Sequence, residues 1–416
     1  MSDKIKIFTI SDHPLSPSGV GLQTKYMIEG MLKTGKYQFV SFGGAIKHKD
    51  HQPQKTEQWG EDWIIWPTDG YGNPEMVRAM IRQQKPDILW FMTDPRFYDW
   101  LWQIENEVRG VVPMVYYHVW DNYPYPQFNR PYYLANDHVA CISKLTYDIL
   151  QTVAPEVDSS YIPHAVESDI FKPLDPDHIK AMRISKNLDD KFLCFWNSRN
   201  ARRKQSGTLI WWFKDFLDQV GHDKATLIMH TDTKDPHGQD LEAIIHELGL
   251  TNGEVLFSRE KISSEDLANM YNMADVTINI SDAEGFGLSA LESLSCATPI
   301  IVTLTGGLQD QVTDGESWYG IGLKPSSQAI IGSQQVPYIY EDRLDKRDFL
   351  TALTQMYELG TEDRREWGDK GREWTEKNFN FDTYIQRWDD LFEQIVEEKG
   401  SWDTREGYTP YEVRTF

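Results

Sequence analysis

Cysteine is scarce in this chain of 416 residues: Cys141, Cys194 and Cys296 stand singly in apolar segments. An odd, scattered set offers neither a disulfide framework nor the paired spacing of a zinc site, and it is typical of buried thiols in a reducing compartment. Apolar runs of about 18 residues are also missing, so no membrane-spanning helix is predicted. The start, MSDKIKIFTIS, lacks the apolar region of a signal peptide. We therefore expect a cytoplasmic protein.

Basic residues are also fewer than acidic residues. The chain has 42 basic and 64 acidic residues, which gives a formal net charge of −22. This net negative charge disfavours general electrostatic binding of nucleic acid, because such binding depends largely on neutralising phosphates. It is compatible with a local basic groove. A hydrophobic content of 40% indicates a packed globular protein. The length exceeds that of one ordinary core and favours two domains.

Strand and helix patterns alternate along the whole chain. One series begins with the strand pattern KIKIFTIS (4–11), and a second begins with KFLCFWNS (191–198) after an Asp- and Pro-rich linker at 167–190. Short apolar strands separated by helices predict parallel sheets covered by helices on both faces. The fold class is therefore α/β, with two doubly wound, Rossmann-like domains, 1–170 and 171–377. The default ligand site is the cleft between them.

A glycine-containing loop follows the first strand. SDHPLSPSGVGLQTK (11–25) places Gly19 and Gly21 just before a helix. Glycines allow backbone N–H groups to approach a ligand closely, and a helix N-terminus favours an anion. The spacing matches neither the dinucleotide fingerprint nor the P-loop. An ordinary strand–helix turn remains the alternative interpretation.

A basic segment follows the first strand of the second series. In WNSRNARRKQ (196–205), Arg199 and Lys204 emerge at the carboxyl end of that strand. An arginine fork and a lysine point charge suit a diphosphate, because both neutralise the charge of a departing phosphate. The alternative is a solvated basic turn.

Two glutamates bracket a strand–loop–helix unit in SDAEGFGLSALESLSCATPI (281–300). Glu284 is expected at the carboxyl end of the strand and Glu292 one or two turns into the helix. Carboxylates accept hydrogen bonds from vicinal hydroxyls, so the pair suits two sugar rings. Between them, the N–H groups of Phe286, Gly287 and Leu288 open the helix towards an anion. A nucleotide sugar carries hexose, diphosphate and ribose in this order.

Glycoside hydrolysis is the alternative for a carboxylate pair. That reaction needs the two acids to flank one bond at roughly 5–10 Å. Here loop and helix separate Glu284 from Glu292, and a helix alone adds about 1.5 Å per residue. A hydrolase would also leave Arg199 and Lys204 without a role.

The stretch from Tyr116 to Tyr133 is unusually aromatic, with eight aromatic residues among eighteen. Aromatic faces stack on sugars and on bases, and the prolines of this segment stiffen the loop. The candidate acceptor contacts are Trp120, Asp121, Tyr123 and Tyr125. An aromatic core patch is the alternative.

These motifs together resemble a known family. EGFGLSALE resembles the E-x7-E motif of retaining GT-B glycosyltransferases, especially glycosyltransferase family 4, and RNARRK resembles the Arg…Lys diphosphate clamp of that family. IPHAVE resembles its interdomain segment, although His164 stands where Asn is usual, and the first-domain loop has SGVG in place of a double glycine. The motifs are specific over roughly 190–315 and looser in the first domain.

The resemblance implies roles for these residues. Glu284 would bind the donor sugar and Glu292 the ribose, while Arg199 and Lys204 would stabilise the leaving diphosphate, with Gly19 and Gly21 on the opposite wall. His118 would lie near the transferred sugar. No metal and no further cofactor would be required, because the basic pair performs the electrostatic task. The final segment, 378–416, would cross back onto the first domain.

The expected function is retaining transfer of a sugar from a nucleoside diphosphate sugar, with UDP favoured, to an acceptor hydroxyl. One alternative acceptor is a hydroxylated DNA base, since the aromatic stretch resembles bacteriophage glycosyltransferases and a flipped base suits an aromatic pocket. A second alternative is a nucleotide-sugar-binding protein without turnover. Neither the acceptor nor the oligomeric state is specified by the sequence.

Overall fold

An eight-stranded sheet forms the centre of the first domain in the computed structural model, which describes residues 4–412. Its strand order is β3-β4-β2-β1-β5-β6-β7-β8, parallel except for β3. The bounds are β1 Ile5–Asp12, β2 Tyr37–Gly44, β3 Gln54–Lys55, β4 Trp63–Pro67, β5 Ile88–Met92, β6 Met114–His118, β7 His138–Cys141 and β8 Ser159–Tyr161.

Strands β5 and β6, near the centre of this sheet, are buried along their whole length. This is expected for parallel strands covered on both faces. The covering helices are α1 Gly19–Lys33, α2 Pro74–Gln84, α3 Asp99–Trp102, α4 Glu105–Arg109, α5 Arg130–Leu134 and α6 Lys144–Val153.

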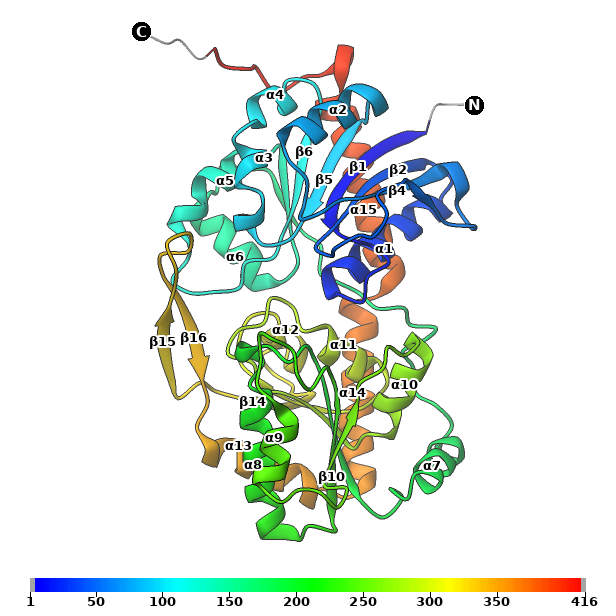
Figure 1. Ribbon diagram of the computed structural model, residues 1–416, viewed down its shortest axis with the longest axis vertical. Helices are drawn as coiled ribbons and strands as arrows, with labels where there is room; N and C mark the ends of the chain where they lie inside the picture. Colours follow the sequence, from blue (N-terminus) through cyan, green and yellow to red (C-terminus); the bar gives the residue numbers. More distant parts are fainter. Residues whose placement is uncertain (1–3, 413–416) are drawn as a thin grey trace.

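The second domain repeats this plan with six parallel strands in the order β11-β10-β9-β12-β13-β14 (Figure 1). Its strands are β9 Phe192–Asn197, β10 Ala225–His230, β11 Val255–Ser258, β12 Val276–Asn279, β13 Ile300–Thr303 and β14 Gly320–Leu323. Its helices are α7 Pro176–Ser185, α8 Ser206–Val220, α9 Leu241–Glu247, α10 Ser264–Met273, α11 Leu288–Ser295, α12 Leu308–Val312 and α13 Lys346–Glu358. The predicted linker at 167–190 thus contains helix α7.

Each sheet has one point at which the order of its strands reverses. In the first sheet the chain moves outward from β1 on one side through β2 and β4, and on the other side through β5 to β8. In the second sheet β9 has the same position, with β10 and β11 on one side and β12 to β14 on the other. Ligands bind beyond the carboxyl ends of strands at such points. The glycine loop follows β1 and the basic segment follows β9, so both predicted loops start at these points.

A hairpin projects from the second domain to the first. Strands β15 (Ser327–Ile331) and β16 (Ile339–Arg343) pair only with each other and run alongside the gap between the domains (Figure 1). The backbone N–H of Tyr340 donates to the carbonyl of Tyr123 (2.5 Å), and the side-chain amide of Asn122 donates to the carbonyl of Tyr340 (3.0 Å). The hairpin therefore links the two domains through non-covalent contacts.

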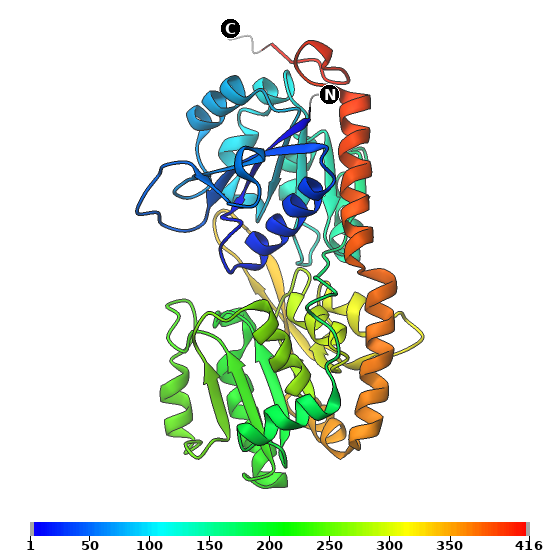
Figure 2. The ribbon, with the colours of Figure 1, turned by 90° about the vertical axis from the view of Figure 1, so that its right-hand side faces the viewer.

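The chain returns to the first domain through its last two long helices (Figure 2). Helix α14 (Thr361–Asn378) packs against α11, and α15 (Phe381–Lys399) packs against α1. Trp388 of α15 meets Trp90 of β5 edge-on, with ring centroids 5.8 Å apart. No helix of the described residues is long and apolar enough to cross a membrane.

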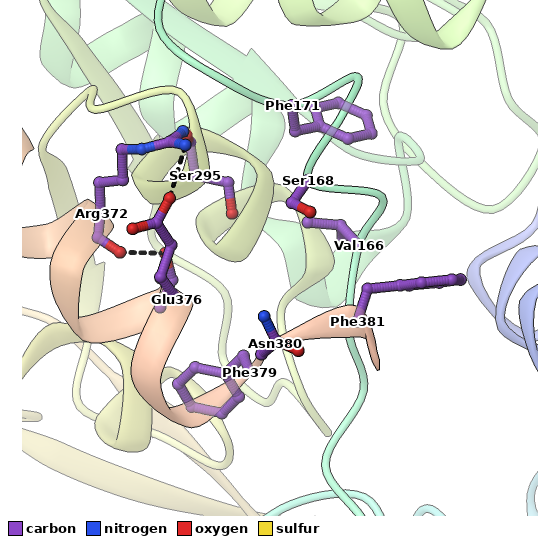
Figure 3. A pocket seen from close by; sticks show the side chains of 10 residues that line it. Val166, Ser168, Phe171, Ser295, Arg372, Glu376, Phe379, Asn380 and Phe381 are labelled. Atoms are coloured by element: carbon purple, nitrogen blue, oxygen red, sulfur yellow. Dashed lines mark hydrogen bonds and ion pairs between the residues drawn. The ribbon is translucent and has the colours of Figure 1, made fainter. Parts of the chain in front are cut away.

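The junction between α14 and α15 lies against the linker that joins the two domains (Figure 3). Phe379 and Asn380 separate the helices, and the Asn380 side chain caps α15 by accepting from the backbone N–H of Thr383 (3.0 Å). A small cavity of about 20 Å³ lies between this junction and Val166 and Phe171 of the linker. Both chain crossings therefore lie side by side on one edge of the molecule.

Candidate functional site

The loops after β9 and β12 meet at the carboxyl edge of the second sheet. A short 3-10 helix at Arg202–Lys204 buries the Lys204 side chain, whose ammonium group forms an ion pair with the carboxylate of Glu284. The Asn279 side-chain amide, at the end of β12, lies 3.4 Å from the same carboxylate oxygen. The structure therefore brings together Lys204 and Glu284, which the sequence places in different motifs.

The backbone of Glu284 is held by the glycine pair that follows β13. The N–H of Gly307 donates to the Glu284 carbonyl (3.1 Å). A Cβ at Gly306 would lie 1.7 Å from that carbonyl oxygen, and Gly306 has a φ of +50°. Only glycine meets both conditions without strain. The turn therefore fixes the position of Glu284.

Burial and the neighbouring charges together set the pKa values of Glu284 and Lys204. Burial opposes ionisation of Glu284, but the charges of Lys204 and Arg203 outweigh it and hold the pKa of Glu284 below its ordinary value. Burial and the nearby charge of Arg203 lower the pKa of Lys204, which the charge of Glu284 partly offsets. Arg203 itself donates from Nη1 to the carbonyl of Ala283. Two cations thus lie beside one carboxylate.

Helix α11 begins directly after this pair. Gly287, with a φ of +92°, is its N-cap residue. Within the described part of the chain, the backbone N–H groups of Phe286, Gly287 and Leu288 donate no hydrogen bond. The Phe286 ring is buried between His164 and Phe379, with centroids 5.1 and 5.8 Å away. The backbone of this turn, and not the Phe286 side chain, is therefore available to an anion.

The glycine loop of the first domain faces the start of α11. A Cβ at Gly19 would lie 3.2 Å from Leu288 Cδ1, across the domain boundary. Gly21 is needed for a different reason, which is the shape of the turn. Its N–H donates to Oγ of Ser18, the N-cap residue of α1 (3.0 Å), and a Cβ at Gly21 would lie 2.6 Å from the His13 carbonyl oxygen. Gly19 therefore lies on the wall opposite α11, whereas Gly21 shapes the turn.

Glu292 lies in the second turn of α11 and is buried. Its Oε2 accepts from the Tyr271 hydroxyl (2.6 Å) and lies 3.5 Å from the Asn197 side-chain amide at the end of β9. Burial raises its pKa to about 7, although these two hydrogen bonds oppose the rise. The two glutamates thus have different partners and different electrostatic environments.

Arg199 is not part of this cluster. Its guanidinium is 60% exposed and binds Asp235 through two contacts of 2.6 and 3.2 Å. Arg203, four residues later, is the arginine whose charge acts on Glu284 and on Asp121. The role expected for Arg199 stays a prediction.

His118 ends β6 and is fully buried. Its Nε2 lies 2.8 Å from the Tyr133 hydroxyl, and its Nδ1 lies 3.7 Å from Cys141 Sγ. Burial lowers its pKa to about 3, so the ring is neutral near pH 7. Both nitrogens face residues of the first domain, and no contact among the described residues joins them to Glu284. Its role near the sugar also stays a prediction.

The loop that follows β6, within the aromatic stretch from Tyr116 to Tyr133, forms the wall of the site that faces Glu284. We call it the aromatic loop. A Cβ at Gly285 would lie 3.8 Å from Asp121 Oδ2. Burial raises the pKa of Asp121 to about 6, and the charge of Arg203 opposes that rise. Tyr123 is 56% exposed, stacks on Tyr340 of the hairpin at 5.7 Å and meets Tyr125 edge-on. Asp121 thus lies at the cluster, while the two tyrosines lie towards the hairpin.

Three features of the site were missed by sequence reasoning. Arg203 lies inside the RNARRK motif, so the sequence identified this segment as part of the site but did not show that the Arg203 side chain contacts it. Asn279 is the last residue of a correctly predicted strand. The hairpin carried a usable signal, because SQAII and IYEDR flank the turn-forming segment GSQQVP.

No group of three or more metal-ligating side chains is found in residues 4–412. The charged groups at the centre of the site are instead paired with one another, as in Lys204 with Glu284 and Arg202 with Glu341.

Comparison with known proteins places this geometry in context. Residues 179–374, which span most of the second domain, match the family model described as "Glycosyl transferases group 1". A D-inositol 3-phosphate glycosyltransferase from Paenarthrobacter aurescens (strain TC1) is 36% identical over 78 residues, which are 19% of this chain and 19% of the relative. The match thus spans about a fifth of that relative's length.

Solved structures resemble the whole molecule. A sucrose-phosphate synthase from Thermosynechococcus elongatus has a TM-score of 0.75 at 18% identity and covers 95% of this chain and 100% of its own. Anabaena Alr3699/HepE in complex with UDP and glucose has a TM-score of 0.70 at 15% identity, with 94% and 100% covered. These likenesses confirm the predicted GT-B fold.

Proposed function

We propose that this protein transfers a sugar, with retention of anomeric configuration, from a UDP-sugar to an acceptor hydroxyl. The observation that supports the proposal best is the ion pair of Lys204 with Glu284 directly before the free N–H groups of α11. A carboxylate, an ammonium and unpaired amide donors at one point suit a ligand that carries hydroxyls next to a diphosphate. The match to the group 1 family model and the UDP bound in the Anabaena structure support the same donor class.

The donor's diphosphate would lie between the N-terminus of α11 and the glycine loop near Gly19. Lys204 and Arg203 would neutralise the charge that develops on the leaving phosphate, which is where preorganised cations accelerate a reaction most. Glu292 would accept hydrogen bonds from the ribose hydroxyls. Its Oε2 is already held by Tyr271, so its other oxygen would face the ribose. No metal ion would be needed in this arrangement.

The transfer step exchanges one bond at the anomeric carbon for another. The bond from this carbon to the diphosphate oxygen breaks, and the acceptor oxygen forms its bond on the same face. The acceptor proton passes to the departing phosphate oxygen, which leaves as UDP. Glu284 is already paired with Lys204, and we assign it to the donor sugar's hydroxyls and not to nucleophilic attack.

Two alternatives compete with this proposal. In the first, the acceptor is a hydroxylated DNA base, which the net charge of −22 disfavours because nucleic-acid binding needs phosphate neutralisation. In the second, the protein binds a nucleotide sugar without turnover. Against it, the Lys204–Glu284 pair and the free amides of α11 are both in place.

The test is an assay of the full chain with UDP-glucose and a panel of hydroxyl acceptors that includes hydroxymethylated DNA. UDP release is measured, products are identified by mass spectrometry, and the anomeric configuration of the product is read by NMR. We expect UDP release with an α-linked product from the α-linked donor. A β-linked product would contradict retention. UDP-sugar binding without UDP release, whatever the acceptor, would show that the protein is inert.

A further inference from the structure

A pocket lies where the tip of the β15–β16 hairpin meets the aromatic loop of the first domain. Its volume is about 290 Å³. The hairpin contributes its tip residues, and the first domain contributes aromatic, amide and charged side chains. The lining residues are Arg96, Asp99, Trp120, Asn129, Tyr132, Gln334, Gln335 and Val336. The pocket is thus shared by both domains and is separate from the pair of Lys204 and Glu284.

The hairpin tip is anchored so that the pocket has a defined shape. Val336 is buried in the core of the first domain. Tyr338 meets Phe128 edge-on at 5.2 Å, and Phe128 in turn meets Trp120 edge-on at 5.7 Å. Gln334 and Gln335, between this anchor and the strand β15, are exposed. Their side-chain amides are therefore available at the rim.

The charged side chains of the pocket already have hydrogen-bond or ion-pair partners. Asp99 accepts from the Tyr132 hydroxyl (3.0 Å) and from the Gln103 side-chain amide (2.6 Å). Arg96 forms an ion pair with Asp94 (2.8 Å). No surplus cation is left for a phosphate, so the pocket suits a neutral ligand and not a polyanion.

The polar groups that remain are those that recognise a sugar. The Trp120 side chain is 5% exposed, and its indole Nε1–H has no hydrogen-bond partner among the described residues. A buried donor without a partner costs free energy, which a ligand acceptor would recover. Trp120 and Tyr132 contribute aromatic surface to the lining, and Asn129, Gln334 and Gln335 contribute amides that both donate and accept.

The pocket adjoins the centre of the site through two consecutive residues. Trp120 lines the pocket, and the next residue, Asp121, lies at Gly285 beside Glu284. Consecutive Cα atoms are about 3.8 Å apart. At the other end of the hairpin, Glu341 of β16 binds Arg202 in two contacts of 2.6 and 2.9 Å, two residues before Lys204. The pocket is thus joined to the centre of the site by adjacent residues of one loop and by the second strand of the hairpin.

We propose that this pocket binds a neutral saccharide ring of the acceptor, and that the hairpin of the donor domain completes it through Gln334 and Gln335. The inference rests on the proposed function, because an acceptor subsite presupposes transfer. It adds the class of acceptor, a neutral hydroxyl-rich sugar, and the segment that selects it. Acceptor recognition is thereby divided between the two domains.

The test measures saccharide binding directly, without turnover. Saturation-transfer NMR on the full chain with UDP uses methyl α-D-glucopyranoside and maltose as probes. We expect saturable binding of at least one probe. The double variant Gln334→Ala/Gln335→Ala should weaken it by about tenfold, since each lost hydrogen bond contributes roughly 0.5–1.5 kcal/mol. Trp120→Phe, which keeps a ring but removes Nε1–H, should weaken it severalfold.

The matched control is Gln394→Ala, an exposed glutamine on α15 whose amide contacts only Glu398; it should bind the probes as the wild type does. Binding of neither probe, or equal binding by the double variant and the wild type, overturns the inference. UDP binding and UDP-glucose hydrolysis in the same samples separate the two proposals. If both persist while saccharides fail to bind, the pocket assignment is wrong and the donor assignment stands. If transfer goes to hydroxymethylated DNA alone, the pocket assignment is likewise wrong.

Discussion

Lys204 and Glu284 form a buried ion pair between two loops that leave neighbouring strands of the second sheet. The pair lies where the donor's sugar would meet its diphosphate. Without a ligand, each partner satisfies the other's charge. Donor binding would replace part of this mutual contact, as phosphate oxygens approach Lys204 and hydroxyls approach Glu284. The pair therefore keeps two reactive groups in place in the empty site.

Removing one partner of this pair should destabilise the protein, and removing both should not. Lys204→Met leaves the buried Glu284 carboxylate without its main partner, which typically costs about 3–5 kcal/mol. The double variant Lys204→Met/Glu284→Gln should recover most of that loss. Urea unfolding of the three proteins checks it. Lys370→Met, which breaks an exposed pair with Glu366, should change stability by less than about 1 kcal/mol. Equal losses in the single and double variants would contradict a coupled pair.

The two glutamates should affect nucleotide binding differently. Glu292→Gln removes a charged acceptor from the ribose and should weaken UDP binding roughly 10- to 150-fold, because a charged hydrogen bond contributes about 1.5–3 kcal/mol. Glu284→Gln should leave UDP affinity unchanged or increase it, since it frees Lys204 to face the diphosphate, but it should lower turnover. Calorimetry with UDP and initial rates with UDP-glucose separate these effects. Similar losses of UDP affinity in both variants would refute the assigned roles.

The sequence was sufficient for the fold, whereas the roles of the candidate site residues stay predictions. Continuous apolar strands such as β5 and the loop glycines made the two doubly wound sheets predictable, because those signals are local. The stretch 97–108 is divided into the two short helices α3 and α4. Tertiary contacts set those boundaries, and no local pattern reports them.

What the sequence lacked was the direction of long side chains. Arg199 and Arg203 stand in one motif, and spacing alone does not tell which of them reaches the site. The outcome depends on Asp235, 36 residues away, which binds Arg199. The burial of His118 is equally non-local, because it depends on Tyr133 of α5 and on Cys141 of β7.

Stability should depend on pH through Glu292. Burial raises its pKa from the ordinary 4.5 to about 7 in the folded protein. A raised pKa contributes stability that is fully present below about pH 4.5 and is lost as the pH rises through 7. The loss should approach about 3 kcal/mol, since one pKa unit corresponds to about 1.4 kcal/mol.

The variant Glu292→Gln cannot ionise, and its side-chain oxygen still accepts from Tyr271. Relative to the wild type, it should therefore gain stability between pH 5 and pH 8. Urea unfolding at the two pH values measures the difference. The exposed Glu398→Gln serves as the control and should show no such gain. A constant difference between the variant and the wild type at both pH values would refute a raised pKa at Glu292.

Arg199 and Arg203 of the basic segment should differ in their effect on catalysis. Arg203 lies beside Asp121 and Glu284: its charge helps to hold the pKa of Glu284 below its ordinary value and opposes the rise that burial causes in the pKa of Asp121. Arg199 is bound to Asp235 and is largely exposed. Arg203→Ala should therefore reduce kcat by about 10²-fold or more, as expected when a preorganised charge is removed from a developing anion. Arg199→Ala should reduce it less.

Asp235→Asn makes this comparison decisive, because it releases Arg199 from its partner without removing the guanidinium. If Arg199 acts only through its bond to Asp235, Arg199→Ala and Asp235→Asn should have the same small effect on kcat with UDP-glucose. If Arg199 instead binds the diphosphate during turnover, Arg199→Ala should match Arg203→Ala, and Asp235→Asn should retain activity. That second result would show that the arginine of the sequence-predicted clamp is the catalytic one and that it leaves Asp235 when the donor binds.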